Sequence, residues 1–337
     1  TCVIASFATE RAAKKIIVET EDDSSEILNN SSASNEHILL AVANVNKMEK
    51  LLDFAILIKD KKSVNPVSVL SVVSDNSEAE KNIIKAKNKL EDFVKQASGT
   101  ETKVNVITTI DHNASSGITR CSREIMADII VLGWPQRTGF LDKLIGEKIE
   151  SILNNTDKTT LICFLEKPLE LHKRIVVAIP PLAEHENGFG LWLTKLAKLA
   201  QELSIPIHGY CNEVTEKSIR RYFNKEKISA SLHISLFSDW DDFLVLARNI
   251  HADDFVVLVS ARRGATSYMS ILDGLPLKIE KHFSVNSRLI IYPQQYDGNT
   301  NLENYSEVSA ETLNRGIEVV QKIGKEIGSM LKKKNQE

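Results

Sequence analysis

Residues 126–139 have the sequence MADIIVLGWPQRTG, and this stretch decides the fold class. Consecutive apolar residues, Ile129 to Leu132, are flanked by an Ala-Asp corner on one side and by a glycine on the other. A short, continuous apolar run between such boundaries is typical of a strand that is buried on both faces of a sheet. A related stretch, HADDFVVL, occupies residues 251–258 with one residue inserted. We therefore expect two copies of one α/β pattern, produced by a tandem duplication.

Short apolar runs alternate with amphipathic stretches on both sides of this motif. Alternation of buried strands with helices predicts a mostly parallel sheet covered on both faces. In the first copy the pattern predicts strands near 38–43, 67–73, 104–110, 129–132 and 160–164, and helices near 46–59, 78–98, 114–126 and 141–153. In the second copy it predicts strands near 175–179, 205–210, 230–236, 255–259 and 287–292, and helices near 187–203, 214–224, 239–250 and 274–282.

Length and composition agree with two globular domains. The chain has 337 residues, and domains average roughly 150 residues. Hydrophobic residues make up 42% and charged residues 26%, which is the balance of a soluble protein with a core. With 42 basic and 45 acidic residues the chain lacks the excess of positive charge that nucleic-acid binding needs.

The four scattered cysteines exclude a disulfide framework and favour a reducing compartment. We expect Cys121 and Cys163 to be buried as small apolar residues.

The first residues form an apolar stretch, Thr1 to Ala8, that is followed at once by charged residues including Arg11, Lys14 and Lys15. Eight residues are too few to cross a bilayer, which takes about 20. An apolar stretch that ends in Arg and Lys is typical of the cytoplasmic end of a transmembrane helix. An amphipathic helix that docks on its own domain explains these residues equally well. Residues 17–36 then turn acidic and rich in Ser and Asn, as in a linker.

A final helix is expected near 307–334, after a polar linker at 294–305. Its apolar positions recur at spacings of three, four and seven: Leu313, Ile317, Val320, Ile327 and Leu331. This spacing forms a seam that packs either on the same chain or on a second copy, and with only about three heptads the same chain is slightly favoured.

A glycine-bearing loop follows the strand at 129–132. It comprises Gly133 to Gly139 and is followed by Gly146-Glu147. Ligands of open α/β sheets bind at the carboxyl ends of the strands, where this loop lies. Glycine lets backbone N–H groups turn toward a phosphate, and a following helix N-terminus adds its dipole.

In this loop and in the five-strand order, the chain resembles the universal stress protein family. Nucleotide-binding members of that family carry Gly-x-x-Gly, nine residues, and then Gly-Ser/Thr. Gly133 and Gly146 occupy the first and third glycine positions, with nine residues from Arg137 to Ile145 between. The resemblance covers 37–166 well and 173–293 more weakly. It implies an α/β fold of two tandem universal-stress-protein-like domains (adenine nucleotide alpha hydrolase-like, Rossmann-like), each with a five-stranded, mostly parallel sheet, plus the C-terminal helix.

The chain also departs from the family pattern. Gln136 stands at the second glycine, Glu147 replaces the hydroxyl residue, and Asn44 stands where the family has an aspartate. A carboxylate about 4 Å from a bound phosphate repels it by up to about 4 kcal/mol at an effective dielectric constant of 20. Lys143, Lys148 and Arg137 would offset part of this. The resemblance thus implies a degenerate ATP or AMP site at Asn44, Gly133, Gln136, Arg137, Gly139, Gly146 and Glu147, and no other cofactor.

The second copy carries a weaker version of the same site. Pro180 takes the aspartate position, and the loop at 259–266 places Arg262 and Arg263 where an anion could approach. Paired arginines on a loop are more often solvated. We also expect Glu184-His185-Glu186 to form an exposed polar turn.

The signatures of an enzyme are missing from the sequence. The eight histidines show no metal-ligand spacing, and neither a Gly-x-Ser-x-Gly elbow nor a Gly-Lys-Ser/Thr phosphate loop occurs. We therefore expect no catalytic residues and no metal site. No set of residues in the sequence supports a hydrolase or a transferase.

Taken together, these features resemble the C-terminal cytosolic half of a bacterial cation/proton antiporter of the monovalent cation/proton antiporter-2 family (sodium/proton antiporter type). The stretch from Ala5 to Ala13 is similar to the end of such a protein's last transmembrane helix. The implied division is 1–16 juxtamembrane, 17–36 linker, 37–168 domain 1, 169–293 domain 2, 294–305 linker and 306–337 C-terminal helix.

This resemblance implies a regulatory module at the cytoplasmic face of the bacterial inner membrane. Its partners would be the membrane transport domain of the same polypeptide, which exchanges sodium or potassium for protons, and a second copy in a homodimer. The alternative is a free-standing cytosolic tandem universal stress protein that binds ATP or AMP.

Overall fold

The computed structural model describes residues 34–43, 48–97, 102–134 and 147–295. The expected membrane-proximal segment, most of the expected linker and the expected C-terminal helix lie outside these residues. None of the helices in the described ranges is both long enough and apolar enough to cross a membrane.

The first half of the fold, β1 to β5, follows the predicted order of strands and helices. Its elements are β1 (Ile38–Ala41), α2 (Met48–Ile58), β2 (Val67–Ser74), α3 (Ala79–Ala97), β3 (Val104–Asp111), α4 (Ala114–Glu124), β4 (Ile129–Gly133), α5 (Glu147–Asn155) and β5 (Thr159–Phe164). Every residue of β1 is buried, as are the first four residues of β4. Because helices cover both faces of these strands, their sequences are continuous apolar runs.

The second half, β6 to β10, repeats this order with shorter helices on one face. Its elements are η3 (Leu169–Leu171), β6 (Arg174–Ala178), η4 (Ala183–His185), α6 (Phe189–Leu203), β7 (Ile207–Cys211), α7 (Glu213–Lys225), β8 (Leu232–Leu236), η5 (Phe243–Asn249), β9 (Asp254–Val259), η6 (Ser270–Gly274), α8 (Leu275–His282) and β10 (Arg288–Tyr292), where η marks a 3-10 helix.

The helix predicted near 239–250 is present but is shorter and of the 3-10 type. The structure has the 3-10 helix η5 there. The buried side chains of Trp240, Phe243 and Leu246 are spaced three residues apart. A 3-10 helix has three residues per turn, so Phe243 and Leu246 lie directly above each other on its buried side.

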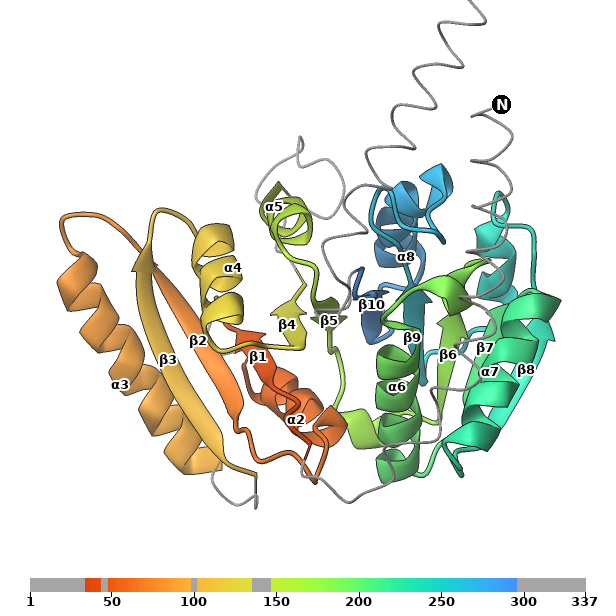
Figure 1. The fold of residues 1–337 in the computed structure, drawn as a ribbon, viewed down its shortest axis with the longest axis horizontal. Helices are drawn as coiled ribbons and strands as arrows, with labels where there is room; N and C mark the ends of the chain where they lie inside the picture. The colour runs from red at the N-terminus through yellow and green to blue at the C-terminus, as the bar shows by residue number, and fades with distance from the viewer. Residues whose placement is uncertain (1–33, 44–47, 98–101, 135–146, 296–337) are drawn as a thin grey trace, which may run out of the picture.

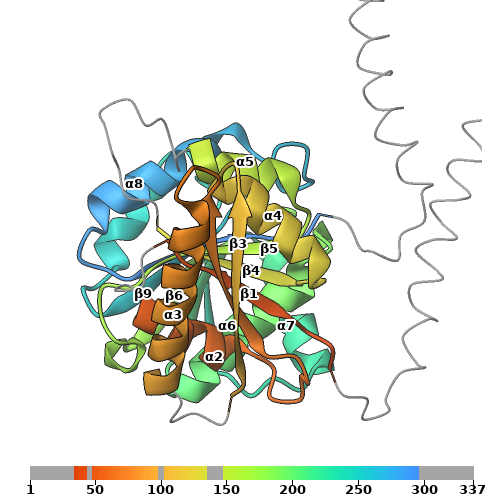
Figure 2. The same cartoon turned by 90° about the vertical axis from the view of Figure 1, so that its left-hand side faces the viewer.

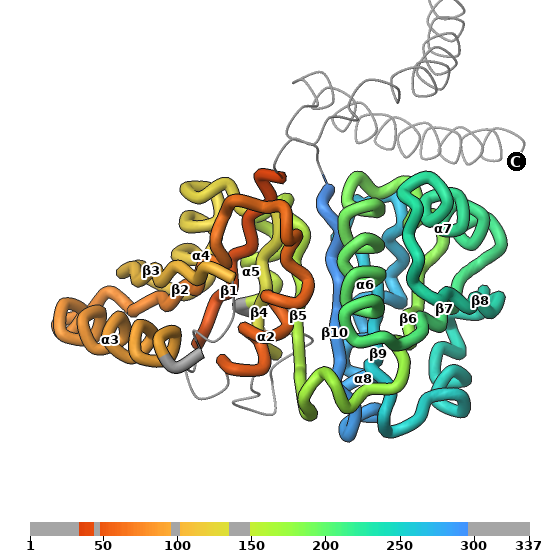
Figure 3. The backbone as a smooth tube through the Cα atoms, turned by 90° about the horizontal axis from the view of Figure 1, so that it is seen from below, coloured from red at the N-terminus to blue at the C-terminus, as the bar shows by residue number. Residues whose placement is uncertain are grey.

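The ten strands in the described ranges form one sheet rather than two separate five-stranded sheets. The order is β3-β2-β1-β4-β5-β10-β9-β6-β7-β8, so each half has the same internal order and the two halves meet at their fifth strands. Neighbours within a half are parallel, while β5 and β10 are antiparallel. Figures 1 and 3 show β5 and β10 side by side at the centre of the molecule. We call this pairing the seam.

Two layers of helices cover the sheet. Buried side chains of α2, α6 and α7 share one apolar cluster with Leu90 of α3, while those of α4, α5 and α8 share the other cluster with η5. In Figure 2, α4 and α5 lie on one side of the strands and α2 and α6 on the other. Each cluster contains residues of both halves, so the cores of the two halves are continuous across the seam.

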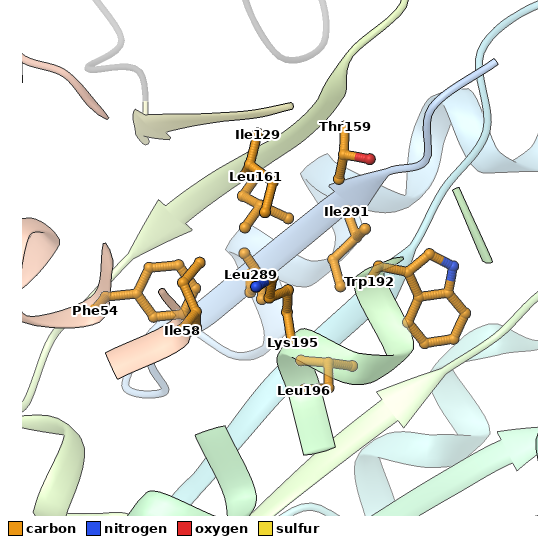
Figure 4. A pocket seen from close by; sticks show the side chains of 10 residues that line it. All are labelled: Phe54, Ile58, Ile129, Thr159, Leu161, Trp192, Lys195, Leu196, Leu289 and Ile291. Atoms are coloured by element: carbon orange, nitrogen blue, oxygen red, sulfur yellow. The ribbon is translucent and has the colours of Figure 1, made fainter. Parts of the chain in front are cut away.

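The seam is closely packed. A cavity of about 10 Å³ lies between α2, α6 and the central strands, which is about the space of one water molecule. Figure 4 shows Phe54 and Ile58 of the first half facing Lys195 and Leu196 of α6 across this cavity, with Leu289 of β10 between them. This part of the contact between the halves is therefore packed like a core, and its cavity is too small for a ligand.

The repeated aspartate of the Ala-Asp corner has a structural role in both halves. Asp128, just before β4, accepts a hydrogen bond from the backbone N–H of His37 at 2.8 Å, just before β1. Asp254, the first residue of β9, holds Arg174, the first residue of β6, through two hydrogen bonds of 2.6 and 2.8 Å. In each half the carboxylate thus fixes the start of the fourth strand against the first.

A buried ion pair ties the segment leading into β1 to the second half. One carboxylate oxygen of Glu36 accepts from the backbone N–H of Asp60 at 3.1 Å, and the other pairs with the ammonium of Lys195 in α6. The two side chains are 11% and 6% exposed. Glu36, which the sequence analysis placed at the end of a linker, is therefore held in the core between the two halves.

We expect Lys195→Met to lower the free energy of unfolding by about 3–5 kcal/mol, because it leaves the Glu36 carboxylate buried without its cation. The double variant Glu36→Gln/Lys195→Met should recover most of this loss. Urea denaturation measures both values.

Lys61→Met is the matched control. Lys61 pairs with Glu202 at 2.7 Å, but its side chain is 78% exposed, so the change should cost less than about 1 kcal/mol. Equal losses for Lys61→Met and Lys195→Met would contradict the role assigned to the buried pair.

Candidate ligand-binding site

The predicted nucleotide loop leaves the carboxyl end of β4. Because the chain runs from β1 outward to β3 and then returns to β4, the sheet changes direction between β1 and β4, and ligands of open α/β folds bind at such a point. Gly133 ends β4 and Glu147 begins α5. The other predicted site residues lie outside the described residues: Asn44, Gln136, Arg137, Gly139 and Gly146. The site as a whole stays a prediction.

Gly133 has a packing role that is independent of any ligand. A Cβ atom at this position would lie 3.2 Å from Cδ1 of Leu51 in α2. That is tighter than ordinary van der Waals contact, so a side chain here would require the Leu51 side chain to shift by a few tenths of an ångström. The glycine alone is therefore weak support for nucleotide binding.

The next residue, Trp134, anchors the loop on the second half. Its backbone N–H donates to the carbonyl of Cys163 at 2.7 Å. The guanidinium carbon of Arg288 lies 5.1 Å from the centre of the Trp134 ring and 4.0 Å from that of Phe164. Such cation–π contacts are stronger in a desolvated setting, and Arg288 is buried. Burial lowers the pKa of Arg288 from its ordinary value.

The role of Arg288 could not be predicted from the sequence because its partners are distant along the chain. The same guanidinium donates to the carbonyl of Phe283 at 2.7 Å, at the end of α8. Arg288 is the first residue of a buried strand, a position that carries no signal for a contact with another half.

In the second half, Arg262 is neither solvated nor open to an anion. Its guanidinium is buried and donates to the carbonyl of Lys158 at 2.6 Å, the hydroxyl of Thr160 at 3.2 Å, and the carbonyl of Pro293. Its Nε donates to the carbonyl of Leu153 at 3.3 Å, in the last turn of α5. Burial lowers the pKa of Arg262 to about 10, so the side chain stays charged at neutral pH. Arg262 is thus a tie across the seam.

The neighbouring Arg263 is exposed, as expected of a surface arginine. It pairs with Asp273 at 3.1 Å, and the hydroxyl of Tyr268 donates to the same carboxylate at 3.0 Å. These contacts hold the loop after β9 close to η6. Arg262 and Arg263 therefore bind different partners and do not point together toward one anion.

The expectation of an exposed turn at Glu184-His185-Glu186 is wrong for both carboxylates. Glu186 is buried and accepts the backbone N–H of Ser267 at 2.7 Å, in the loop after β9. Glu184 has a side chain only 6% exposed and accepts from the hydroxyl of Thr215 at 2.7 Å, while His185 is exposed. The loop folds back over the strand ends and buries the acids against hydroxyl and backbone donors.

These contacts close the second-half position to anions. Glu186 already occupies a backbone N–H of the loop after β9, which is the kind of donor that binds a phosphate in open α/β folds. A second negative charge placed beside it would be repelled. In the second half, polar groups at the position of the nucleotide loop are therefore already hydrogen-bonded to other parts of the chain.

No reactive thiol or metal cluster occurs in the part of the chain that the structure describes. Cys121, Cys163 and Cys211 are free and buried, as predicted for the first two. Burial raises the pKa of all three thiols, that of Cys211 to about 12, so they stay protonated at neutral pH. Among the same residues, no group of three or more His, Cys, Asp or Glu side chains is arranged to hold a metal ion.

Comparison with known proteins confirms the resemblance predicted from the sequence. Residues 34–163 match the universal stress protein family. The chain is also similar to the Na⁺/H⁺ antiporter NhaS5 of Synechocystis sp., with 24% identity over 269 residues. This match covers 74% of the chain and 38% of the antiporter, so the chain spans about two-fifths of that relative.

Solved structures show the same fold. The cytoplasmic domain of a prokaryotic cation chloride cotransporter superimposes with a TM-score of 0.52 at 12% identity, covering 78% of this chain and 98% of that one. A functionally unknown protein from Pseudomonas aeruginosa PAO1 gives a TM-score of 0.52 at 14% identity, covering 78% and 94%. At these identities the likeness concerns the fold alone.

We expect Arg262→Met to lower the free energy of unfolding by about 2–4 kcal/mol, because it leaves buried carbonyl oxygens of both halves without a donor. Arg263→Met is the matched control on the adjacent residue. Because Arg263 is exposed, its loss should change the free energy by no more than about 0.5 kcal/mol. Chemical denaturation followed by circular dichroism measures both, and similar effects of the two changes would contradict the assignment of Arg262 as the tie.

Proposed function

We propose that residues 1–337 form the cytosolic regulatory module of a membrane cation/proton antiporter. The module would lie at the cytoplasmic face of a bacterial inner membrane and act on the transport domain of the same polypeptide. It would have no catalytic activity of its own. Regulation of this kind requires a ligand or contact that differs in affinity between two states of the transporter.

The similarity to a Na⁺/H⁺ antiporter is the observation that carries this proposal. It extends over most of the chain but over well under half of the relative, which leaves room in the relative for a separate transport part. The cytoplasmic domain of a cation chloride cotransporter has the same fold, so this architecture also occurs as a module beside a membrane transporter. Sodium or potassium would be the exchanged cation.

The positions of the first and last described residues support a role in coupling. Glu36, just before β1, pairs with Lys195 in the middle of α6. At the other end of the described chain, the carbonyl of Gln295 accepts from Asn187 at 2.9 Å, and that of Gln294 accepts from Gly188 at 3.1 Å, at the start of α6. At 1.5 Å per residue, these contacts lie about 10 Å apart along one helix. The polypeptide on both sides of the module would thus act on α6.

Tandem domains and self-association are parts of the same proposal. The boundary between domain 1 (37–168) and domain 2 (169–293) would fall just after β5, and the degenerate second domain would serve as a partner that completes the sheet. A homodimer would form through a free sheet edge or through the segment 306–337.

Nucleotide binding would be at most weak. The proposed site is the loop after β4, with Asn44, Gly133, Gln136, Arg137, Gly139, Gly146 and Glu147 facing ATP or AMP. The closed second-half position supports a scaffold or dimerisation role over nucleotide sensing. The alternative, a free-standing stress protein that binds ATP or AMP, has less support because the similarity to the antiporter extends over 74% of the chain.

The coding sequence upstream of Thr1 tests the proposal directly. We expect it to encode several apolar stretches of about 20 residues, the length that spans a bilayer. In inverted membrane vesicles, deleting residues 34–337 from that polypeptide should leave cation/proton exchange measurable but change its dependence on cytosolic conditions. A start codon a few residues before Thr1 would overturn the proposal.

Calorimetric titration of residues 1–337 with ATP and AMP tests the alternative. The variant Gln136→Gly/Glu147→Ser restores the family pattern and serves as the comparison. We expect it to bind at least about tenfold more tightly than the unchanged chain, a difference of about 1.4 kcal/mol. Micromolar binding by the unchanged chain would favour the free-standing stress protein.

A further inference from the structure

Two histidines lie directly opposite each other on the last two strands of the second half. His208 of β7 and His233 of β8 are register partners in a parallel pair, so their side chains project from the same face of the sheet. Their ring centres are 4.9 Å apart, with an angle of 40° between the ring planes. The two imidazoles are in contact, and neither has a role in the candidate ligand site.

The charged groups near the two histidines leave no free negative charge. Arg174 at the start of β6 and Asp254 at the start of β9 face His208, and they are bonded to each other at 2.6 Å. Arg174 also donates to the carbonyl of Asn249 in η5, and a ring nitrogen of His233 lies 3.3 Å from the hydroxyl of Ser231. The single carboxylate of this group is already neutralised by the arginine. A proton added to His208 would therefore be opposed by the charge of Arg174 and favoured only in part by Asp254.

His208 accordingly resists protonation in the folded chain. Burial lowers its pKa from the ordinary value of 6.5, the positive charges of Arg174 and His233 lower it further, and Asp254 opposes them only in part. In the unfolded chain the histidine has no such neighbours. A base whose pKa is lower when folded stabilises the fold above about pH 6.5. That stability is lost as the pH falls below this value.

Strand β8, which carries His233, can separate from the sheet more easily than the other strands. β8 is the last strand of the sheet, is five residues long, and among the described strands pairs with β7 alone. None of its residues is buried, and Leu236 at its end is 66% exposed. Elements with few buried contacts open at low cost without unfolding the rest of a protein.

We propose that the His208–His233 pair is a proton-operated switch that releases the edge strand β8 from β7. At neutral pH the uncharged ring of His208 packs against the ring of His233, and the strand stays paired. When a proton binds His208, the charged ring is better hydrated with β8 displaced, because burial is the main cause of its lowered pKa, and β8 then separates from β7. This deepens the proposed function and rests on it in one respect: the pH that is sensed would be that of the cytosol.

Hydrogen exchange of the whole 337-residue chain, compared between pH 7.5 and 5.5, tests the switch. Protection factors of the β8 amides, corrected for the intrinsic effect of pH, should be lower at pH 5.5 than at pH 7.5, because protonation of His208 favours the open strand. Protection of the buried strand β9 should not change. In His208→Asn the fall should be absent, whereas in His282→Asn, which removes an exposed histidine of α8, it should persist.

Three results would overturn the proposal: no fall at β8, an equal fall in His208→Asn, or an equal fall in β9. If His208→Asn fails to fold, proton NMR titration of the unchanged chain decides instead, and a pKa of His208 at or above that of His282 would count against the switch. These readouts concern the chain alone. They are therefore independent of the transport assay. A negative transport assay would overturn the proposed function but would leave the proposed switch unaffected.

Discussion

The antiparallel pairing of β5 with β10 is the constraint on which the rest of the molecule depends. It runs from Arg288 opposite Phe164 to Tyr292 opposite Thr160, and every residue of β10 is buried. Without it, each half would expose a long apolar edge, which natural proteins avoid. The pairing also merges the two cores, because both apolar clusters contain residues of both halves. Arg262 and Arg288 then add polar ties across the seam that a purely apolar contact would lack.

The same seam connects the candidate site with the end of the described chain. The loop after β4 leads into α5, and the last turn of α5 is held by Arg262 through the carbonyl of Leu153. Arg262 also binds the carbonyl of Pro293, directly after β10. Residues 294 and 295 then run to the start of α6, the helix whose Lys195 holds Glu36. A ligand that moved α5 would thus act on contacts shared by both ends of the described chain.

The sequence predicted the elements well and their assembly less well. Continuous apolar runs such as Ile129 to Leu132 located the buried strands because both faces of the sheet are covered. The spacing of Phe243 and Leu246 fits an α-helix as well as a 3-10 helix, so the pattern located the helix but not its type. The seam left no local signal, since β5 and β10 are apolar like their neighbours. Arg262 and Glu186 were misjudged because their partners lie in distant parts of the chain.

Thermal unfolding of the 337-residue chain by differential scanning calorimetry tests most directly whether the two halves act as one body. A shared core and a shared sheet predict one cooperative transition, with equal calorimetric and van't Hoff enthalpies. The Arg262→Met variant should lower the temperature of that transition or split it. Two separate transitions in the unchanged chain would contradict the account, because the halves would then fold independently and the seam would be a weak contact between finished domains.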